Sequence, residues 1–384
     1  MKLSISRETL LKCLQQVAGV VERKHTMPIL ANVLIRIHDN ELSCTGTDLE
    51  VELVATQRLE AGQVVEAGEI TVPCRKLLDI CKSLPANARI DLSLEEQKLQ
   101  LRSGRSRFTL TTLPAADYPS LEDDEGAFSL KISQSNLKHL MDRTAFAMAL
   151  QDVRYYLTGM LFEVNHNQLR AVTTDGHRLA LFDAAAEATP TERIQVILPR
   201  KGVQELQRLV SEDDSLLHLT FGASHMQVTV PVLNPKAKEG EDGHEGYVAF
   251  TSKLIDGKFP DYNRVLPKGG DKVVLVNHDE FRQALQRASI LTNEKYRGVR
   301  LFLKDNELHI QANNPEQEEA REELQAEYQG DALEIAFNVQ YLLDVLAVLQ
   351  GANAKLVLSD GNASALVQES DNQDALYVVM PMRL

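Results

Sequence analysis

Hydrophobic and polar positions follow the same pattern at three places along the chain. Three segments each begin with a short apolar run that leads into a helix-like spacing of apolar residues. Their matching positions are Ile5, Leu10 and Leu14, then Ile132, Leu137 and Met141, and finally Val276, Phe281 and Leu285. Leu42 and Asp48 of the first copy move by the same number of residues to Leu169 and Asp175 of the second. This constant spacing indicates one supersecondary plan that is used again.

Each repeat is predicted to contain two halves, in which a strand leads into a short helix and then into further strands. In the first repeat the predicted helices span Arg7–Val21 and Arg75–Leu84. The predicted strands of that repeat are Lys2–Ser6, Ile29–His38, Glu41–Thr45, Glu50–Arg58, Glu69–Val72, Ala88–Leu94, Lys98–Ser103 and Arg107–Thr112. The later helices are predicted over Gln134–Ala149, Arg200–Val210, Asp279–Leu291 and Val339–Leu349. Strands outnumber helices and hairpin turns join them, which predicts an α+β fold with helices on one face of antiparallel sheets.

Two charged, turn-rich segments separate the repeats. They lie near residues 122–126 and 268–271, so we expect domains over residues 1–125, 126–268 and 269–384. The polar, glycine-rich segment Asn234–Gly246 falls between two predicted partner strands, which is typical of a hairpin loop. A chain of 384 residues with 43% hydrophobic content can give each domain its own core.

Composition narrows the cellular setting. No apolar run is long enough to span a membrane, and the first residues are predicted to form a strand rather than a signal peptide. The four cysteines show no zinc-like spacing, which predicts reduced core thiols in a cytoplasmic protein without a metal site or other cofactor. They are Cys13, Cys44, Cys74 and Cys81.

The formal net charge of −14 argues, by itself, against nucleic acid as a partner. The charges are nevertheless segregated, because basic residues outnumber acidic residues on the predicted helices, whereas the acidic excess falls on strands, loops and termini. Two interpretations remain open. The helices could gather on a surface that faces a polyanion, or they could be ordinary amphipathic helices with solvated outer faces.

The two ends of the chain also differ in charge. Arg102, Arg105 and Arg107 lie on the last predicted hairpin of the first repeat. An acidic cluster in the third repeat consists of Glu316, Glu318, Glu319, Glu322 and Glu323. Complementary patches at opposite ends suit head-to-tail association, which closes into a ring when the rotation allows it. The alternative is two solvated faces.

Several stretches along the whole chain resemble the β subunit of bacterial DNA polymerase III, the sliding-clamp family. They are Gly46–Glu50 (GTDLE), Arg102–Phe108 (RSGRSRF), Leu113–Tyr118 (LPAADY), Gln151–Leu157 (QDVRYYL), Thr174–Leu179 (TDGHRL), Pro199–Val203 (PRKGV), Phe259–Tyr262 (FPDY), Asn313–Ala320 (NNPEQEEA) and Tyr377–Leu384 (YVVMPMRL). The resemblance implies three similar domains per chain, with antiparallel sheets outside and two helices per domain facing a central channel. It further implies a homodimeric ring around double-stranded DNA, which acts as a non-catalytic processivity factor in DNA replication.

The resemblance also implies three sets of site residues and a set of partners. Those expected to bind DNA are Lys24, where the family often has arginine, Gln151, Tyr155, Tyr156, Arg200 and Lys201. A pocket for short peptides containing glutamine and leucine or phenylalanine is expected from Leu157, Thr174, Gly176, His177, Arg178, Leu179, Pro260, Arg264, Val265, Val378, Met380, Pro381, Met382, Arg383 and Leu384. The dimer interface is expected to contain Arg105, Arg107, Phe108, Leu110, Ile290, Leu291, Glu316, Glu318 and Glu319. The implied partners are the polymerase III α subunit, other polymerases, the clamp loader and repair proteins that carry such a peptide.

Some of these residues have a structural alternative. Tyr155 and Tyr156 could be core residues, and Met380 and Met382 could belong to the core of a last strand. The methionines suit a surface that accepts varied partners, because their side chains are flexible. Arg178, Arg264 and Arg383 could form the rim of that surface.

Two other classes of function are considered. Asp175 and His177 could work together as an acid–base pair or hold a metal in an enzyme. Against this, Asp48 recurs at the position of Asp175, which indicates an aspartate that bonds backbone N–H groups at a turn, and no catalytic motif accompanies the pair. A protein scaffold that never encloses DNA would share the repeat and the pocket, but it would not be retained on circular DNA.

Overall fold

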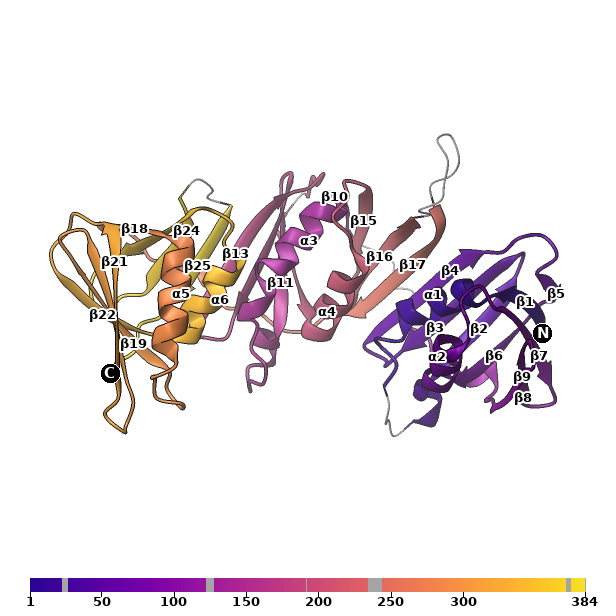
Figure 1. Cartoon of the computed structure of the whole chain (residues 1–384). Coiled ribbons are helices and arrows are strands. Elements are labelled where there is room, and N and C mark those ends of the chain that lie inside the picture. The colour runs from indigo at the N-terminus through magenta and orange to yellow at the C-terminus, as the bar shows by residue number, and fades with distance from the viewer. Residues whose placement is uncertain (23–26, 122–127, 191, 234–243, 371–373, 384) are drawn as a thin grey trace. The chain divides into compact units, whose positions relative to one another are not determined.

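The computed structural model describes residues 1–22, 27–121, 128–190, 192–233, 244–370 and 374–383. Lys24, Leu384 and most of the predicted loop Asn234–Gly246 lie outside these residues. The chain divides into two compact units, and Figure 1 labels their elements. Unit 1 contains Met1–Ser135 and Lys201–Leu254, and unit 2 contains Asn136–Arg200 and Ile255–Leu384.

Unit 1 contains two antiparallel sheets, whose strand orders are β5-β1-β7-β8-β9 and β10-β15-β16-β17-β4-β3-β2-β6. The strands are β1 (Lys2–Ser6), β2 (Asn32–His38), β3 (Glu41–Thr47), β4 (Val51–Arg58), β5 (Val64–Glu66), β6 (Gly68–Pro73), β7 (Arg89–Glu95), β8 (Lys98–Ser103), β9 (Ser106–Thr111), β10 (Phe128–Ser133), β15 (Leu216–Phe221), β16 (His225–Leu233) and β17 (His244–Lys253). The helices are α1 (Arg7–Val17), α2 (Cys74–Ser83) and α4 (Arg200–Leu209), of which Arg200 belongs to unit 2. Pairing between β17 and β4 joins the first and second repeats into one sheet.

Unit 2 is built on a twelve-stranded sheet with the order β14-β11-β12-β13-β25-β24-β23-β18-β21-β20-β19-β22. The strands are β11 (Gly159–Asn165), β12 (Gln168–Thr174), β13 (Arg178–Ala185), β14 (Ile194–Pro199), β18 (Lys272–Asn277), β19 (Gly298–Lys304), β20 (Glu307–Asn313), β21 (Glu319–Glu327), β22 (Leu333–Asn338), β23 (Asn353–Leu358), β24 (Ala365–Glu369) and β25 (Ala375–Val379). The helices are α3 (Gln134–Asp142), which begins in unit 1, α5 (His278–Ser289) and α6 (Val339–Val348). Pairing between β13 and β25 joins the second and third repeats, so the second repeat contributes to both units.

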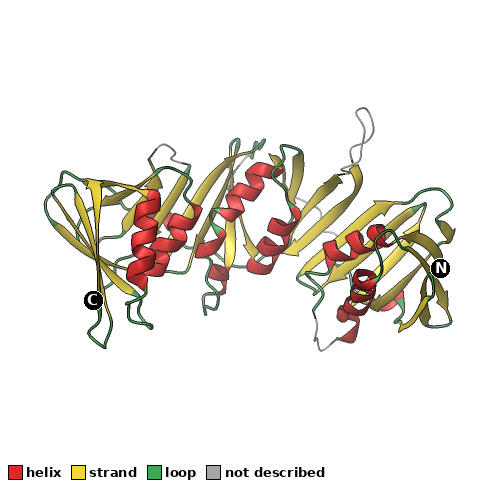
Figure 2. Cartoon of the chain, viewed as in Figure 1, coloured by secondary structure: helices red, strands yellow, loops and turns green. Residues whose placement is uncertain are grey.

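The helices are amphipathic and lie against the sheets, as Figure 2 shows for α5 and α6 in unit 2. Leu10 and Leu14 of α1, Leu137 of α3, and Phe281 and Leu285 of α5 are all buried, and each of them belongs to the repeated pattern. The α+β class with antiparallel sheets is therefore confirmed. Each apolar face is buried because that removes its area from water.

Three predicted boundaries differ from the observed ones by three residues or more. The first helix ends at Val17 rather than Val21. Two residues after its end, the backbone of Gly19 lies so close to the Glu205 carboxylate that a Cβ atom on residue 19 would be 2.4 Å from the carboxylate oxygens. The helix predicted over Gln134–Ala149 ends at Asp142 and is followed by a 3-10 turn, Ala145–Ala147. The strand predicted from Ile29 begins at Asn32, after the 3-10 turn Pro28–Ala31. In each case a tertiary contact or a turn overrides the local spacing.

Candidate functional site

Asp48 and Asp175 occupy the same kind of turn in the first and second repeats. The Oδ1 atom of Asp48 accepts hydrogen bonds from the backbone N–H groups of Glu50 (2.9 Å) and Val51 (2.7 Å). The Oδ1 atom of Asp175 accepts from those of His177 (2.9 Å) and Arg178 (3.0 Å). The interpretation as turn chemistry is therefore confirmed, and these carboxylates are committed to the backbone rather than to an acid–base pair.

The second oxygen of each aspartate meets a basic side chain. In unit 1, Asp48 Oδ2 forms an ion pair with Lys201 Nζ, and Glu22 lies 3.2 Å from the same nitrogen. Burial alone would lower the pKa of Lys201, but the bonds to Asp48 and Glu22 outweigh it and raise that pKa. Lys201, a predicted DNA-binding residue, is thus charged and already has two acidic partners.

In unit 2, Arg178 is held by internal contacts. Its Nε atom donates to Asp175 (3.1 Å), its Nη1 atom to Asp344 of α6, and its Nη2 atom to the carbonyl of Phe146 (2.8 Å). The guanidinium also lies over the ring of Tyr341, 4.7 Å from its centroid. Since each of its nitrogens donates internally, Arg178 joins the second repeat to the third.

The other predicted DNA-binding residues of unit 2 differ in their surroundings. Gln151 is exposed, and Tyr155 is 55% exposed while its hydroxyl donates to the carbonyl of Asp256 (2.8 Å). Tyr156 is half-buried and packs against the apolar cluster described below. The Nη1 atom of Arg200 donates to the carbonyl of Met148 (3.2 Å). Of the two tyrosines, Tyr156 therefore resembles a core residue more than Tyr155 does.

Four of the predicted pocket residues belong to, or pack against, one group of side chains in unit 2, which we call the apolar cluster. Leu157, Leu179 and Val378 belong to its buried part, and Val265 packs against it. The other buried members are Ala149, Leu161, Val172, Leu181, Ile197, Phe259 and Tyr262, and the other partly buried ones are Tyr156, Ile255, Leu266, Leu366 and Leu376. The sheet brings these distant residues together through the β13–β25 pairing, in which Leu179 lies opposite Val378.

Beside this cluster a cavity of about 760 Å³ contains several predicted residues. The predicted residues His177, Arg178 and Gln151 line it, and so does Arg154, which was not predicted. The sequence analysis missed Tyr341 of α6, which also lines the cavity and stacks on the ring of His177 at 6.3 Å between centroids. An aromatic residue near the start of a helix does not stand out in sequence, because the same spacing is expected of a core position.

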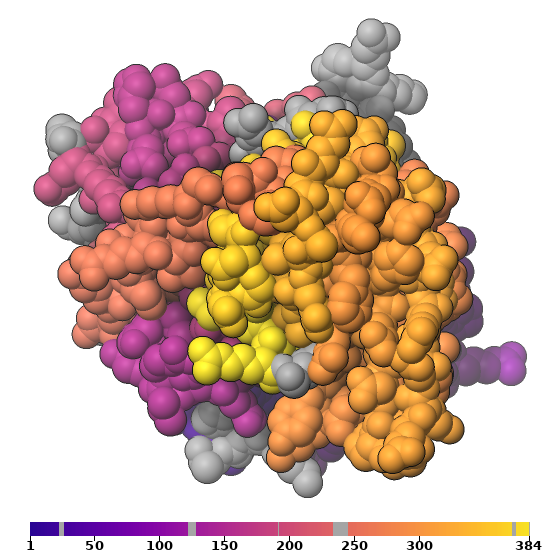
Figure 3. Space-filling view, turned by 90° about the vertical axis from the view of Figure 1, so that its left-hand side faces the viewer, coloured from indigo at the N-terminus to yellow at the C-terminus, as the bar shows by residue number. Residues whose placement is uncertain are grey.

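The last described residues run along the surface next to the cluster. Strand β25 ends at Val379, so Met380 and Met382 lie beyond it, and both are half-buried. The N–H of Met380 donates to the carbonyl of His177 (2.9 Å), and that of Met382 to the carbonyl of Ala336 (2.7 Å). Figure 3 shows this yellow segment at the surface, with the salmon-coloured residues near 260 on one side and the orange third repeat on the other.

The remaining predicted pocket residues that the structure describes do not belong to the apolar cluster. Thr174 and Gly176 belong to the Asp175 turn and are half-buried, as is Pro381. Pro260 and Arg383 are exposed. The side chain of Arg264 is 86% exposed, and its Nε atom donates to Asp261 Oδ2 (3.1 Å). Arg264 therefore has an exposed side chain, whereas the guanidinium of Arg178 is held by contacts within unit 2.

The predicted interface residues lie on an edge strand of unit 1 and around β21 and the end of α5 in unit 2. β9, which carries Arg107, Phe108 and Leu110, is the last strand of its sheet, and Arg105 precedes it in the hairpin turn. In the third repeat, Glu319 begins β21, whose pairing with β18 is confined to the far end of the strand. Ile290 is 76% exposed just after α5, Leu291 is half-buried, and Glu316 and Glu318 are exposed. Part of the acidic cluster is already paired within the chain, because Arg287 binds Glu322 (2.6 Å) and Arg321 binds Glu319 (3.0 Å).

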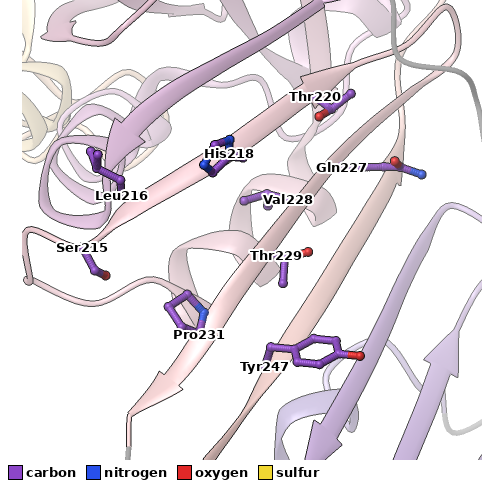
Figure 4. Close-up of a pocket in the computed structure, with 9 residues that line it drawn as sticks. All are labelled: Ser215, Leu216, His218, Thr220, Gln227, Val228, Thr229, Pro231 and Tyr247. Carbon is purple, nitrogen blue, oxygen red and sulfur yellow. The ribbon is translucent and has the colours of Figure 1, made fainter. Parts of the chain in front are cut away.

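Unit 1 has a further cavity that contains no predicted site residue. It measures about 590 Å³ and lies on the exposed face of β15, β16 and β17, where Figure 4 shows its lining. Leu216 and Tyr247 are partly exposed there beside His218 and Thr229.

All four cysteines are buried free thiols, as predicted. Among the residues that the structure describes, no group of three or more histidine, cysteine or acidic side chains is arranged to hold a metal ion. No described helix is both long enough and apolar enough to cross a membrane.

Comparisons with known proteins agree along the whole chain. Models of the DNA polymerase III beta subunit match its N-terminal domain at residues 1–122, its central domain at 131–261 and its C-terminal domain at 263–383. The beta sliding clamps of Pseudomonas aeruginosa and Escherichia coli K12 are 56% and 48% identical, and each comparison covers all of both chains. The crystal structure of a sliding clamp from Pseudomonas aeruginosa bound to griselimycin superposes with a TM-score of 0.93 at 56% identity, over 100% of both chains.

Proposed function

Because the chain belongs to the DNA polymerase III β-subunit family, we propose that it acts through three surfaces: one for DNA, one for peptides and one for a second copy of itself. As a member of this family the chain is a sliding clamp, a non-catalytic processivity factor that works as a homodimeric ring on double-stranded DNA. It binds polymerases and other proteins that carry a clamp-binding peptide. The match of all three domains over the full length carries this conclusion.

For DNA, we propose Gln151, Tyr155, Tyr156, Arg200 and Lys201, together with Lys24, which lies outside the described residues. A clamp that slides must contact phosphates, because phosphate contacts are independent of sequence whereas base contacts specify position. Lys201 and Arg200 supply positive charge, and Tyr155 offers an exposed ring. The link to DNA is topological, so polymerase held by the ring stays at a high local concentration near the primer end.

For peptides, we propose the apolar cluster and its edge, including Thr174, Gly176, His177, Arg178, Pro260, Arg264 and the segment from Met380 to Leu384. The buried floor of Leu157, Leu179 and Val378 suits an apolar anchor, and the half-buried methionines can adapt to different partners. Polymerase III α, other polymerases, the clamp loader and repair proteins would then compete for the same surface.

For the dimer, we propose that β9 of one chain meets the β21 region of another. An open strand edge offers unpaired backbone groups to a second strand. Arg105 and Arg107 would face Glu316, Glu318 and Glu319, and Phe108, Leu110, Ile290 and Leu291 would supply the apolar part. Two such joints close the ring.

We also propose a cytoplasmic location, where the replicating DNA of a bacterium lies, and domain boundaries at residues 1–125, 126–268 and 269–384. The three proposed domains correspond to the three sequence repeats. The sheets continue from one repeat to the next, because β4 pairs with β17 and β13 pairs with β25.

A run-off experiment tests the function. The protein is loaded by a clamp loader onto a nicked circular plasmid, and half of the sample is then linearised. We expect retention on the circle and loss from the linear form, because a topologically linked ring slides off the ends. Equal retention on both forms would refute the ring, and retention on neither would favour the scaffold that never encloses DNA.

A further inference from the structure

One wall of the proposed peptide pocket is an irregular segment, which we call the 259–266 wall. Buried and exposed residues alternate along it. Phe259 and Tyr262 are buried in the apolar cluster, whereas Pro260, which lies between them, and Arg264, which follows them, are exposed. A short 3-10 turn, Tyr262–Arg264, contains the second aromatic residue. Since this wall lies outside the sheet, something other than the strand ladder must hold it in place.

The hydroxyl group of Tyr262 enters a buried polar network on the sheet below. It donates to Glu163 Oε2 (3.0 Å) and accepts from Arg170 Nη1 (3.2 Å). Tyr262 is only 2% exposed and Glu163 only 3%. Arg193, exposed on one side, also donates to Glu163.

Strand register builds this network. Glu163 of β11 lies directly opposite Gln195 of β14 on one side and Arg170 of β12 on the other. Arg170 in turn lies opposite Asp183 of β13. The polar row therefore runs straight across four neighbouring strands, and we call Gln195, Glu163, Arg170 and Asp183 the polar row.

Every neighbouring pair in the polar row is bonded or bridged. Gln195 donates to Glu163 (2.8 Å), and Arg170 donates to Asp183 through both Nε (2.6 Å) and Nη2 (2.7 Å). Tyr262 supplies the bridge between Glu163 and Arg170. Such a satisfied network, which is buried at Glu163 and Tyr262, is directional and selects one arrangement, which apolar contact alone does not.

We propose that the Tyr262 hydroxyl and the polar row position the 259–266 wall for peptide binding, so that Tyr262 and Glu163 are positioning residues of the pocket. This inference rests on the proposed peptide function. The ring of Tyr262 belongs to the same buried cluster as Leu157, Leu179 and Val378, and its hydroxyl fixes where that ring and the exposed Pro260 and Arg264 stand. A wall held in its bound position spares the peptide the entropy of ordering it.

The variant Tyr262→Phe removes only the hydroxyl and keeps the ring in the cluster. Glu163 retains Arg193, Gln195 and Asn165 as donors, so the protein is expected to fold. The matched control is Tyr328→Phe, which also removes one buried tyrosine hydroxyl, here bonded to the carbonyl of Asp331 (2.5 Å) and outside the apolar cluster.

The probe is a fluorescein-labelled synthetic peptide with a glutamine followed by leucine and phenylalanine, and its Kd is measured by anisotropy well below the unfolding temperature. We expect Tyr262→Phe to bind about three- to tenfold more weakly, and Tyr328→Phe to bind like the wild type. Hydrogen exchange should speed up at the amides of the 259–266 wall in Tyr262→Phe. A merely structural role would lower the melting temperature without moving either readout.

The outcomes separate the two levels of the argument. Unchanged peptide affinity in Tyr262→Phe, or equal weakening in Tyr328→Phe, would overturn the positioning role while leaving the pocket in place. Failure of the wild type to bind the peptide would instead overturn the proposed pocket itself.

Discussion

Asp48 holds its own turn with one carboxylate oxygen and forms an ion pair with Lys201 through the other. The turn lies in the first repeat and Lys201 at the start of α4 in the second, so the pair connects two repeats within unit 1. It also partly neutralises a lysine that is proposed to contact DNA. The positive charge that the protein offers to DNA phosphates therefore depends on the Asp48 carboxylate as well as on the number of basic residues.

Asp48→Asn should increase the salt dependence of DNA binding. Asparagine keeps a carbonyl oxygen for the turn but no longer neutralises Lys201, and adding Glu22→Gln removes the second acidic partner. The double variant should steepen the slope of log K against log salt by up to about 0.9 per chain, measured by anisotropy with a short duplex. Asp305→Asn is a matched control, because it frees Lys304 on a strand turn outside the proposed DNA surface and should leave the slope unchanged.

Arg178 and Asp344 should be energetically coupled. Each single change to alanine leaves a partly buried charge without its partner, so each should lower the free energy of unfolding of unit 2. The double variant should cost about 1–2 kcal/mol less than the sum of the single variants in thermal unfolding. Purely additive costs would contradict this. Arg264→Ala, at an exposed pair, should leave stability almost unchanged.

The four cysteines should not react in the folded protein. The pKa of Cys44 is raised mainly by a hydrogen bond with Cys13 and, to a smaller extent, by burial. Burial also raises the pKa of Cys74 to about 11 and that of Cys81 to about 12. The reactive thiolates of Cys44, Cys74 and Cys81 are therefore scarce at pH 8, and Cys13 is inaccessible because it is fully buried. A chromogenic disulfide reagent should label no thiol in the native state and all four after denaturation. Rapid labelling of the native protein would show that the first repeat opens.

Truncation of Met380–Leu384 should abolish binding of a polymerase-derived peptide while the dimer survives. These residues border the apolar cluster, whereas the proposed dimer residues lie on β9 and near β21. Peptide affinity by anisotropy and mass by sedimentation are measured on the same sample. Met380→Ala, which keeps the backbone bond to His177, should weaken peptide binding less. Unchanged affinity after truncation would mean that the pocket is misplaced.

Glu163 should make stability depend on pH in the acidic range. Burial tends to raise its pKa, but hydrogen bonds from Arg193, Gln195, Asn165 and Tyr262 outweigh this and lower it below the ordinary value of 4.5. Because the folded-state pKa is depressed, the stabilisation is complete above the unfolded-state pKa and is lost as pH falls through the folded-state pKa. The melting temperature of the wild type should therefore fall more steeply below about pH 4.5 than that of Glu163→Gln. Parallel curves would exclude this role.

The repeat, the α+β class and the faces of the helices could be predicted from the sequence. Leu10, Leu137 and Phe281 are buried as their spacing predicts, and Asp48 and Asp175 bond the backbone as their recurrence in a turn predicts. The helix faces and the turns are local features, since the residues that determine them lie within a few positions of one another, and the repeat is visible because the same local pattern recurs along the chain.

The tertiary structure alone decided which charged and aromatic groups meet. Arg178 binds Asp175 and Asp344 while it lines the cavity beside the apolar cluster, and Tyr341 lines the same cavity without any mark in the sequence. Likewise, nothing near Tyr262 in the chain indicates that its hydroxyl reaches Glu163 and Arg170. Such partners are set by the register of strands that lie far apart in the sequence, and register follows from the packing of the whole sheet rather than from local spacing.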